Sequence, residues 1–233
     1  MVARPTVLLC DFDGTVTAID TGVLVLEKFA RGDWRALDEL YDRGGATVEE
    51  VLTRQFAMVG AKKWEILDAV EGKAPLRRGF ARLVRFCDQE GIPLTIVSYG
   101  LDFCIGSVLG KAGLRGKVEV VSPLARFAKG GIVLDYPKRT ISGSVNMKDD
   151  IVLQHKKSGH KVVFVGDGTS DFPAAREADE CFVVRGSRLE EMCRAEGVRS
   201  LSILSFGPVE DALRESCRED DTHLHPRPGH PTS

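Results

Sequence analysis

At two places in the sequence, a closely spaced pair of carboxylates directly follows a short apolar run. The first pair lies in the segment Asp11-Phe12-Asp13-Gly14-Thr15. Side chains two residues apart on an extended chain point the same way, and neighbouring carboxylates repel each other unless a cation or a proton intervenes. This segment therefore indicates a cation site or an acid/base pair, with an ordinary Asp-Gly turn as the alternative.

The second pair, Asp167 and Asp171, lies in the segment Gly166-Asp167-Gly168-Thr169-Ser170-Asp171. Glycine permits the tight turns that such a segment needs. Carboxylate oxygens suit a hard cation such as Mg²⁺. A turn without a ligand is the alternative here too.

Two further segments suit an anion. Ser98-Tyr99-Gly100 precedes a helical pattern that begins near Asp102, and a hydroxyl with free N–H groups at a helix start favours anion binding. Lys148 begins another helical pattern. A positive charge at a helix N-terminus interacts unfavourably with the helix dipole, and a bound anion would offset that cost. The alternatives are a helix cap with a turn glycine and a solvated surface lysine.

Short apolar runs precede most of these segments and are typical of buried strands. Helical patterns lie between them, which predicts a parallel sheet with helices on both faces. The carboxyl ends of such strands are where open α/β sheets bind ligands. The predicted strands are Thr6–Cys10, Pro93–Ser98, Val118–Ser122, Lys161–Val165, Glu180–Val184 and Leu201–Leu204.

Two regions depart from this alternation. Leu124–Ala128 and Ile132–Tyr136 flank Lys129-Gly130-Gly131, which predicts a β-hairpin. Residues 17–76 carry helical stripes without a convincing strand, which predicts a helical cap above the strand ends. We therefore divide the chain into an α/β core of residues 1–16 and 77–218, a cap of residues 17–76, and a disordered tail of residues 219–233.

The order D-x-D-G-T, Ser, Lys and G-D-G-x-x-D resembles the haloacid dehalogenase superfamily, and the position of the helical insert resembles its phosphoserine phosphatase-like branch. The resemblance implies a Rossmann-like fold and a magnesium-dependent phosphatase. It implies Asp11 as nucleophile and Asp13 as acid/base. Mg²⁺ would bind Asp11, Asp167 and the Asp13 carbonyl, with Asp171 and Gly168 supporting. Thr15, Ser98, Gly100 and Lys148 would hold the phosphoryl group.

Longer strings resemble one group within that branch, which includes the 2-hydroxy-3-keto-5-methylthiopentenyl-1-phosphate phosphatases. They are Ser98–Phe103 and the segment from Gly166 to Ala175. Tyr99 departs from that pattern, since it replaces the first glycine of the usual pair. The resemblance to phosphoserine phosphatases puts Asp20 near the acid that meets the substrate amine. It puts Gln55 at the position of the carboxylate-binding arginine, with Arg54 one residue away, so Asp20 and Arg54 are possible substrate contacts in the cap.

The composition indicates which kinds of binding partner the protein has. The net charge is −2 with mixed acids and bases, which favours neither nucleic acid nor a membrane surface. No apolar run approaches the length of a spanning helix, and we expect a cytoplasmic enzyme acting on a small-molecule phosphate. Six scattered cysteines are typical of buried apolar positions. A phosphotransferase and a catalytically silent binding protein remain alternatives, and the sequence does not indicate the oligomeric state.

Overall fold

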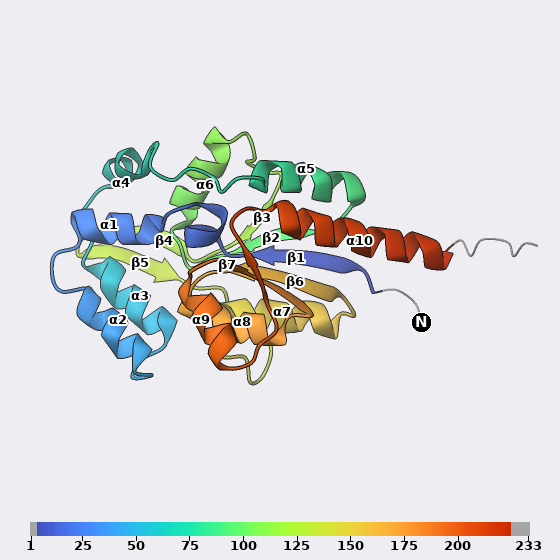
Figure 1. The fold of residues 1–233 in the computed structure, drawn as a ribbon. Helices are drawn as coiled ribbons and strands as arrows, with labels where there is room; N and C mark the ends of the chain where they lie inside the picture. The colour runs from blue at the N-terminus through green and yellow to red at the C-terminus, as the bar shows by residue number, and fades with distance from the viewer. Residues whose placement is uncertain (1–3, 225–233) are drawn as a thin grey trace, which may run out of the picture.

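A single parallel sheet forms the centre of the molecule. The computed structural model describes residues 4–224, with side chains as far as residue 218. The sheet has six strands in the order β3-β2-β1-β6-β7-β8, all paired in parallel (Figure 1). The strands are β1 (Thr6–Cys10), β2 (Leu94–Val97), β3 (Glu119–Val121), β6 (Lys161–Gly166), β7 (Glu180–Val184) and β8 (Leu201–Ile203).

Alternating apolar residues place β1 between two hydrophobic layers. Leu8 and Cys10 face one cluster, while Val7 and Leu9 face the other. Helices α5, α6 and α10 cover the first face, and α7, α8 and α9 cover the second (Figure 1). Their bounds are α5 (Phe80–Glu90), α6 (Asp102–Lys111), α7 (Met147–Lys157), α8 (Phe172–Glu177), α9 (Arg188–Ala195) and α10 (Gly207–Leu224).

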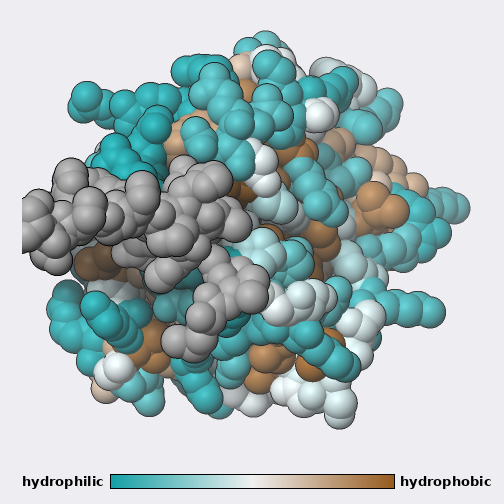
Figure 2. All heavy atoms as spheres, turned by 90° about the vertical axis from the view of Figure 1, so that its right-hand side faces the viewer, coloured by the Kyte–Doolittle hydropathy of each residue, from teal (hydrophilic) through white to brown (hydrophobic). Residues whose placement is uncertain are grey.

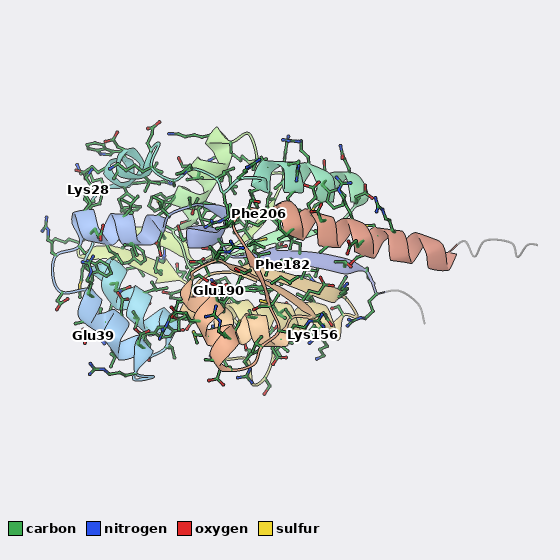
Figure 3. All side chains as sticks on the ribbon, in the orientation of Figure 1. Lys28, Glu39, Lys156, Phe182, Glu190 and Phe206 are labelled. Atoms are coloured by element: carbon green, nitrogen blue, oxygen red, sulfur yellow. The ribbon has the colours of Figure 1, made fainter. Side chains whose placement is uncertain are left out.

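Large aromatic side chains fill the first layer. Phe182 from β7 and Phe206 before α10 are both buried, and Phe206 packs on Phe80 with ring centroids 5.1 Å apart. Both labelled phenylalanines lie inside the molecule, whereas Lys28 and Glu39 lie at its outer edge (Figure 3). The fold expected from the sequence is thereby confirmed: a parallel sheet covered on both faces, with a separate hairpin.

Residues 17–76 form four helices beyond the carboxyl ends of the strands (Figure 1). Thr17 and Leu76 pair in an isolated antiparallel bridge, so the chain enters and leaves this region at adjacent points. The division into core and cap stays our proposal. The helices are α1 (Thr21–Phe29), α2 (Arg35–Asp42), α3 (Val48–Ala57) and α4 (Lys63–Val70).

The hairpin β4 (Leu124–Ala128) and β5 (Gly131–Asp135) packs against α3. Gly131 has a φ of +147°, and a Cβ there would lie 2.1 Å from the carbonyl oxygen of Ala57. A side chain at residue 131 would therefore collide with the cap backbone. The hairpin and the cap meet at a contact that only glycine fits.

The C-terminal region differs from the sequence-based expectation. α10 continues to Leu224, so residues 219–224 are helical rather than part of a disordered tail. Once a helix is anchored by packing, here through Val209 and Leu213, each further residue adds a hydrogen bond at little cost. The expected disorder of residues 225–233 falls outside the described residues.

The end of the molecule away from the cap is mostly hydrophilic, with apolar atoms in small scattered patches (Figure 2). Among residues 4–224, no helix combines the length and apolar character that crossing a membrane requires.

Candidate active site

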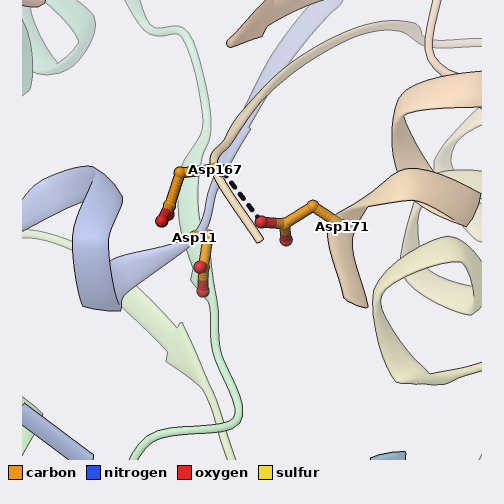
Figure 4. A group of neighbouring side chains, drawn as sticks. All are labelled: Asp11, Asp167 and Asp171. Carbon is orange, nitrogen blue, oxygen red and sulfur yellow. Dashed lines mark hydrogen bonds between the residues drawn. The ribbon is translucent and has the colours of Figure 1, made fainter. Parts of the chain in front are cut away.

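Three carboxylates converge where β1 and β6 end. Asp11 follows β1, Asp167 follows β6, and Cys10 at the end of β1 pairs with Val165, one residue before the end of β6. Asp171 reaches the same place from the turn before α8, and one oxygen from each carboxylate lies within 4.8 Å of the others (Figure 4). The parallel register of the sheet thus joins the two acidic segments, which are far apart in the sequence.

Lys148 bridges two of these carboxylates. Its Nζ lies 2.8 Å from Asp11 Oδ1 and 2.6 Å from Asp171 Oδ1, and its side chain is 2% exposed. Burial alone would lower the pKa of Lys148, but the charges of Asp11 and Asp171 raise it above its ordinary value. The lysine is therefore a fixed positive charge inside the site. It is not the solvated surface lysine that stood as the alternative.

The start of α7 positions Lys148. The Asn146 side chain accepts hydrogen bonds from the backbone N–H groups of Lys148 at 2.8 Å and Asp149 at 3.3 Å. The Asp149 carboxylate accepts from the N–H of Asn146 at 2.6 Å. These reciprocal bonds satisfy donors that a helix start would leave unpaired. They fix the helix end from which the lysine projects.

Asp171 holds the loop that follows β6. Its Oδ2 accepts the backbone N–H of Asp167 at 3.0 Å and of Gly168 at 2.8 Å, while Oδ1 is bonded to Lys148. Figure 4 marks the bond to Asp167. Because both oxygens of Asp171 already accept hydrogen bonds, this residue organises the loop and leaves Asp11 and Asp167 as the carboxylates that a cation would meet.

The charge balance of the site fits a divalent cation. Burial raises the pKa of Asp11 well above its ordinary value, and the nearby Asp171 raises it further. Burial and Asp171 also raise the pKa of Asp167 to about 6. Buried carboxylates at this separation favour a cation that offsets their repulsion, and oxygen donors match Mg²⁺. The residues present therefore fit magnesium, with Asp11 and Asp167 as its carboxylate ligands.

Asp13 is held by the first helix of the cap region. Its Oδ1 accepts hydrogen bonds from Thr21 N at 2.7 Å and Thr21 Oγ1 at 2.6 Å. Burial, followed by the charge of Asp20, raises the pKa of Asp13 to about 7, although the Thr21 bonds oppose this shift. A carboxyl group with a pKa near neutrality suits acid/base catalysis.

Close backbone approach shapes the turn after β1. Gly14 has a φ of +75°, and a Cβ there would lie 2.2 Å from Asp167 Oδ2. Thr15 Oγ1 donates to Asp167 Oδ1 at 2.5 Å, and Arg77 donates to the carbonyls of Thr15, at 2.8 Å, and Gly14. Thr15 thus contacts a carboxylate that would bind the cation, and Arg77 holds the turn from outside the motif.

The segment after β2 completes the site. Ser98 is buried, and its Oγ accepts the Gly100 N–H at 2.9 Å. A Cβ on Gly100 would lie 2.4 Å from Asp13 Oδ2, so the glycine allows the carboxylate to sit directly over the backbone. Tyr99 turns its ring toward Lys148, whose Nζ lies 5.6 Å from the ring centroid.

A cavity of about 370 Å³ extends from these residues into the cap region. Its core lining includes Asp11, Asp13, Ser98, Gly100, Lys148, Asp167 and Gly168, and its cap lining includes Asp20. Asp20 also caps α1 by accepting the Val23 N–H at 2.8 Å, and burial raises its pKa.

Of the two candidate substrate contacts in the cap, Asp20 lines the cavity and Arg54 does not. Arg54 is exposed and does not line the cavity, whereas its neighbour Gln55 is buried in the lining. Gln55 Nε2 donates to Asp38 Oδ1 at 2.7 Å and to the Trp34 carbonyl at 3.0 Å. A shift of one residue turns a helical side chain by about 100°, which accounts for the difference.

Several residues of the site were absent from the sequence interpretation. Thr21, Arg77 and Asn146 hold catalytic candidates in place, yet none belongs to a motif. The N-cap position of Asn146 could have been found from Asn-x-x-Asp before the helical pattern. Thr21 and Arg77 depend on contacts between distant segments, and no local pattern indicates them.

The model of the haloacid dehalogenase-like hydrolase family matches residues 8–176. The chain therefore belongs to this family. The matched region runs from within β1 into α8, so it contains all the converging segments described above.

The names of curated relatives specify a particular phosphatase, whereas the family model specifies only a hydrolase family. A 2-hydroxy-3-keto-5-methylthiopentenyl-1-phosphate phosphatase of Brevibacillus brevis is 29% identical, covering 91% of this chain and 96% of the relative. One of Geobacillus thermodenitrificans is 30% identical, covering 91% and 96%. The bifunctional enzyme MtnB/MtnX of Bacillus licheniformis is 30% identical over 91% of this chain, which spans 50% of that longer protein.

Solved structures support the fold. A substrate-bound phosphoserine phosphatase superposes with a TM-score of 0.67 at 15% identity, covering 91% of this chain and 98% of that one. At such identity the likeness concerns the fold alone. Together, these findings confirm the family, the fold and the phosphatase class that the sequence predicted.

Proposed function

We propose that the protein hydrolyses a small-molecule phosphate monoester through an aspartyl-phosphate formed on Asp11, with Mg²⁺ bound. The observation that carries this proposal is the convergence of Asp11, Asp13, Lys148 and Asp167 around one cavity. A nucleophile, an acid/base, a fixed cation and a metal-binding carboxylate are together what phosphoryl transfer requires.

In the first step, an oxygen of Asp11 attacks phosphorus while the bond from phosphorus to the leaving oxygen breaks. Asp13 donates its proton to that oxygen, which departs as an alcohol or enol. In the second step, water attacks phosphorus, the bond from phosphorus to the Asp11 oxygen breaks, and Asp13 takes a proton from the attacking water, so that phosphate and free Asp11 remain. The raised pKa of Asp13, about 7, matches a group that exchanges a proton in both steps.

The surrounding residues neutralise and orient charge. Mg²⁺, bound by Asp11, Asp167 and the Asp13 carbonyl, would offset the negative charge of the phosphoryl oxygens. Lys148 contributes a positive charge that its two carboxylate partners keep in place. Ser98 and Gly100 line the space where the transferring group would lie, whereas Thr15 is fully buried and donates its hydroxyl to Asp167.

The cap end of the cavity favours a neutral leaving group with an apolar portion. Leu26, Trp34 and Phe56 contribute apolar surface there, and Asp38 and Asp42 contribute negative charge. Among the described residues that line the cavity, Lys148 is the single lysine or arginine. A carboxylate in the leaving group of a substrate would therefore lie near acidic side chains, with no second lysine or arginine among the described lining residues to pair with it.

The charges that line the cavity favour a substrate without a carboxylate over one that carries a carboxylate. The relatives' substrate, 2-hydroxy-3-keto-5-methylthiopentenyl-1-phosphate, carries no carboxylate and ends in an apolar methylthio group. Phosphoserine carries a carboxylate. We infer that this enol phosphate, or an ester of similar shape without a carboxylate, is preferred over phosphoserine.

The test is phosphate release from a panel of monoesters with magnesium present. The panel holds the enol phosphate, phosphoserine, a sugar phosphate, a nucleotide and a generic aryl phosphate. We expect the highest kcat/KM for the enol phosphate and the lowest for phosphoserine. The opposite order would contradict the substrate inference but leave the phosphatase proposal standing.

Asp11→Asn is the second arm of the test. It keeps the shape of the side chain and removes the nucleophilic charge, so we expect no turnover from a folded protein. Substantial residual phosphatase activity would refute Asp11 as the nucleophile. Adding alcohol acceptors to the wild type separates hydrolysis from phosphotransfer, and release from no ester would favour a catalytically silent binding protein.

A further inference from the structure

Tyr99 connects three segments through one hydroxyl group. It lies between Ser98 and Gly100 and is 7% exposed. Its hydroxyl donates to Glu49 Oε1 on α3 at 2.6 Å and accepts the backbone N–H of Met147, the first residue of α7, at 2.9 Å. One side chain thus touches the anion-binding turn, the cap and the helix that carries Lys148.

The bond to Glu49 is a strong one by its geometry and its charge. A hydroxyl donating to a carboxylate at this distance is a charge-assisted hydrogen bond. Burial raises the pKa of Tyr99, and the neighbouring Glu49 raises it further. The hydroxyl therefore remains a donor throughout the ordinary pH range. The bond connects the core to the first turn of α3.

A second tyrosine supports the same contact. Tyr136, directly after β5, donates from its hydroxyl to the Glu49 carbonyl at 3.1 Å. Its ring packs edge-on against Tyr99 with centroids 6.1 Å apart. Glu49 is thus held through its side chain by Tyr99 and through its backbone by Tyr136. Neither contact involves Thr17 or Leu76, which pair where the chain joins the two regions.

We propose that Tyr99 is a positioning residue that fixes α3 over the catalytic cavity by its hydrogen bond to Glu49. Val48 and Leu52, on either side of Glu49 in α3, line the cavity beside Tyr99 itself. Fixing Glu49 therefore sets the wall that the leaving group meets. The proposal rests on the proposed function for its kinetic test, but the structural contact can be tested without turnover.

The start of α7 does not depend on Tyr99 alone. Asn146 accepts from the next two N–H groups, and Asp149 returns a bond to Asn146. Loss of the tyrosine hydroxyl should therefore affect the cap wall more than the placement of Lys148. This separates a role in substrate binding from a role in the chemical step.

The kinetic test is a double-mutant cycle with Tyr99→Phe, Glu49→Ala and the combined variant. Tyr99→Phe keeps the ring and removes the hydroxyl. Hydrogen bonds to charged groups carry enough energy for roughly a 10-fold effect or more. We expect KM to rise by about that factor in each single variant, with kcat changed less than about 3-fold.

The combined variant should be about as impaired as the worse single variant, because both changes remove the same bond. Inhibition by inorganic phosphate, which does not extend to the cap wall, should keep its KI. Glu39→Ala is the matched control, since Glu39 is an exposed acid of α2 at the edge of the molecule (Figure 3). This control should leave KM unchanged.

Amide hydrogen exchange tests the contact independently of activity. We expect exchange in α3 to accelerate in Tyr99→Phe and in Glu49→Ala, but not in Glu39→Ala. Fully additive KM effects, a KI for phosphate that rises as much as KM, or unchanged exchange in α3 would overturn the proposal. A wild type without turnover would refute the proposed function, and the exchange experiment would still decide the role of Tyr99.

Discussion

Replacing Lys148 with an uncharged residue tests how much its buried ion pairs contribute to the stability of the protein. Lys148→Met keeps most of the side-chain volume but leaves Asp11 and Asp171 without the cation that lies 2.8 and 2.6 Å from their oxygens. The two carboxylates are 9% and 0% exposed, so water can replace the lost partner only in part. Breaking a buried ion pair on one side costs about 3–5 kcal/mol of folding free energy.

The matched control is Lys161→Met. Lys161 forms an ion pair with Glu180 at 2.7 Å, but its side chain is 25% exposed and that of Glu180 is 36% exposed. At a similar distance and much greater exposure, such a pair is worth about 0–1 kcal/mol. The comparison therefore sets a buried lysine with two carboxylate partners against a partly exposed lysine with one carboxylate and the Ser216 hydroxyl as partners.

The assay is urea unfolding at neutral pH in metal-free buffer, with the free energy extrapolated to water. We expect Lys148→Met to lose at least about 2 kcal/mol more than Lys161→Met. A second substitution, Asp171→Asn, should recover part of the loss in Lys148→Met by removing one unpaired charge. Equal losses in the two lysine variants would refute the reasoning that burial determines this interaction.

Three further predictions follow from the site and its supports. Chelation with EDTA should stop phosphate release and Mg²⁺ should restore it; full activity in metal-free buffer would contradict the magnesium proposal. Gly14→Ala should lower kcat/KM about 100-fold or more. The new Cβ would lie 2.2 Å from Asp167 Oδ2 and would push that carboxylate out of place; steady-state kinetics tests this. Asp150→Asn should reduce stability near pH 7 by about 1–3 kcal/mol, and the difference from wild type should shrink below about pH 4; urea titrations at several pH values test this.

The sign of the Asp150 effect follows from its partners. Burial raises the pKa of Asp150, but the N–H groups of Ile141 and Thr140, with the side chains of Gln154 and Ser144, lower it below its ordinary value overall. A carboxylate with a depressed folded-state pKa stabilises the protein above its unfolded-state pKa. That contribution is lost as the pH falls through the folded-state value.

The strands and the residues at their ends were predictable because each rests on a local pattern. Apolar runs bounded by Asp or Gly defined β1 and β6, and the parallel register then placed Asp11 beside Asp167. Short helices with few buried residues were not predictable in this way. α2 spans only Arg35–Asp42 and buries only Leu37 among its own residues, so too few apolar residues mark it as part of a core.

Side-chain direction in the cap was the least predictable feature. Arg54 and Gln55 are adjacent, and the packing of α2 against α3 determines which one enters the cavity. The contact of Tyr99 with Glu49 joins positions 50 residues apart. No pattern within either segment contains it. Such contacts depend on tertiary structure, whereas motif residues depend on strand ends that the sequence marks directly.

The antiparallel pairing of Thr17 with Leu76 also bears on how such enzymes diversify. Because the two crossings are neighbours, the segment between them can lengthen, shorten or be exchanged without stretching β1 or displacing α5. Domain insertions are best tolerated where the ends of the insert lie close together. A lineage can thus acquire a new substrate by replacing one contiguous stretch of the gene, while the residues that handle the phosphoryl group are inherited unchanged.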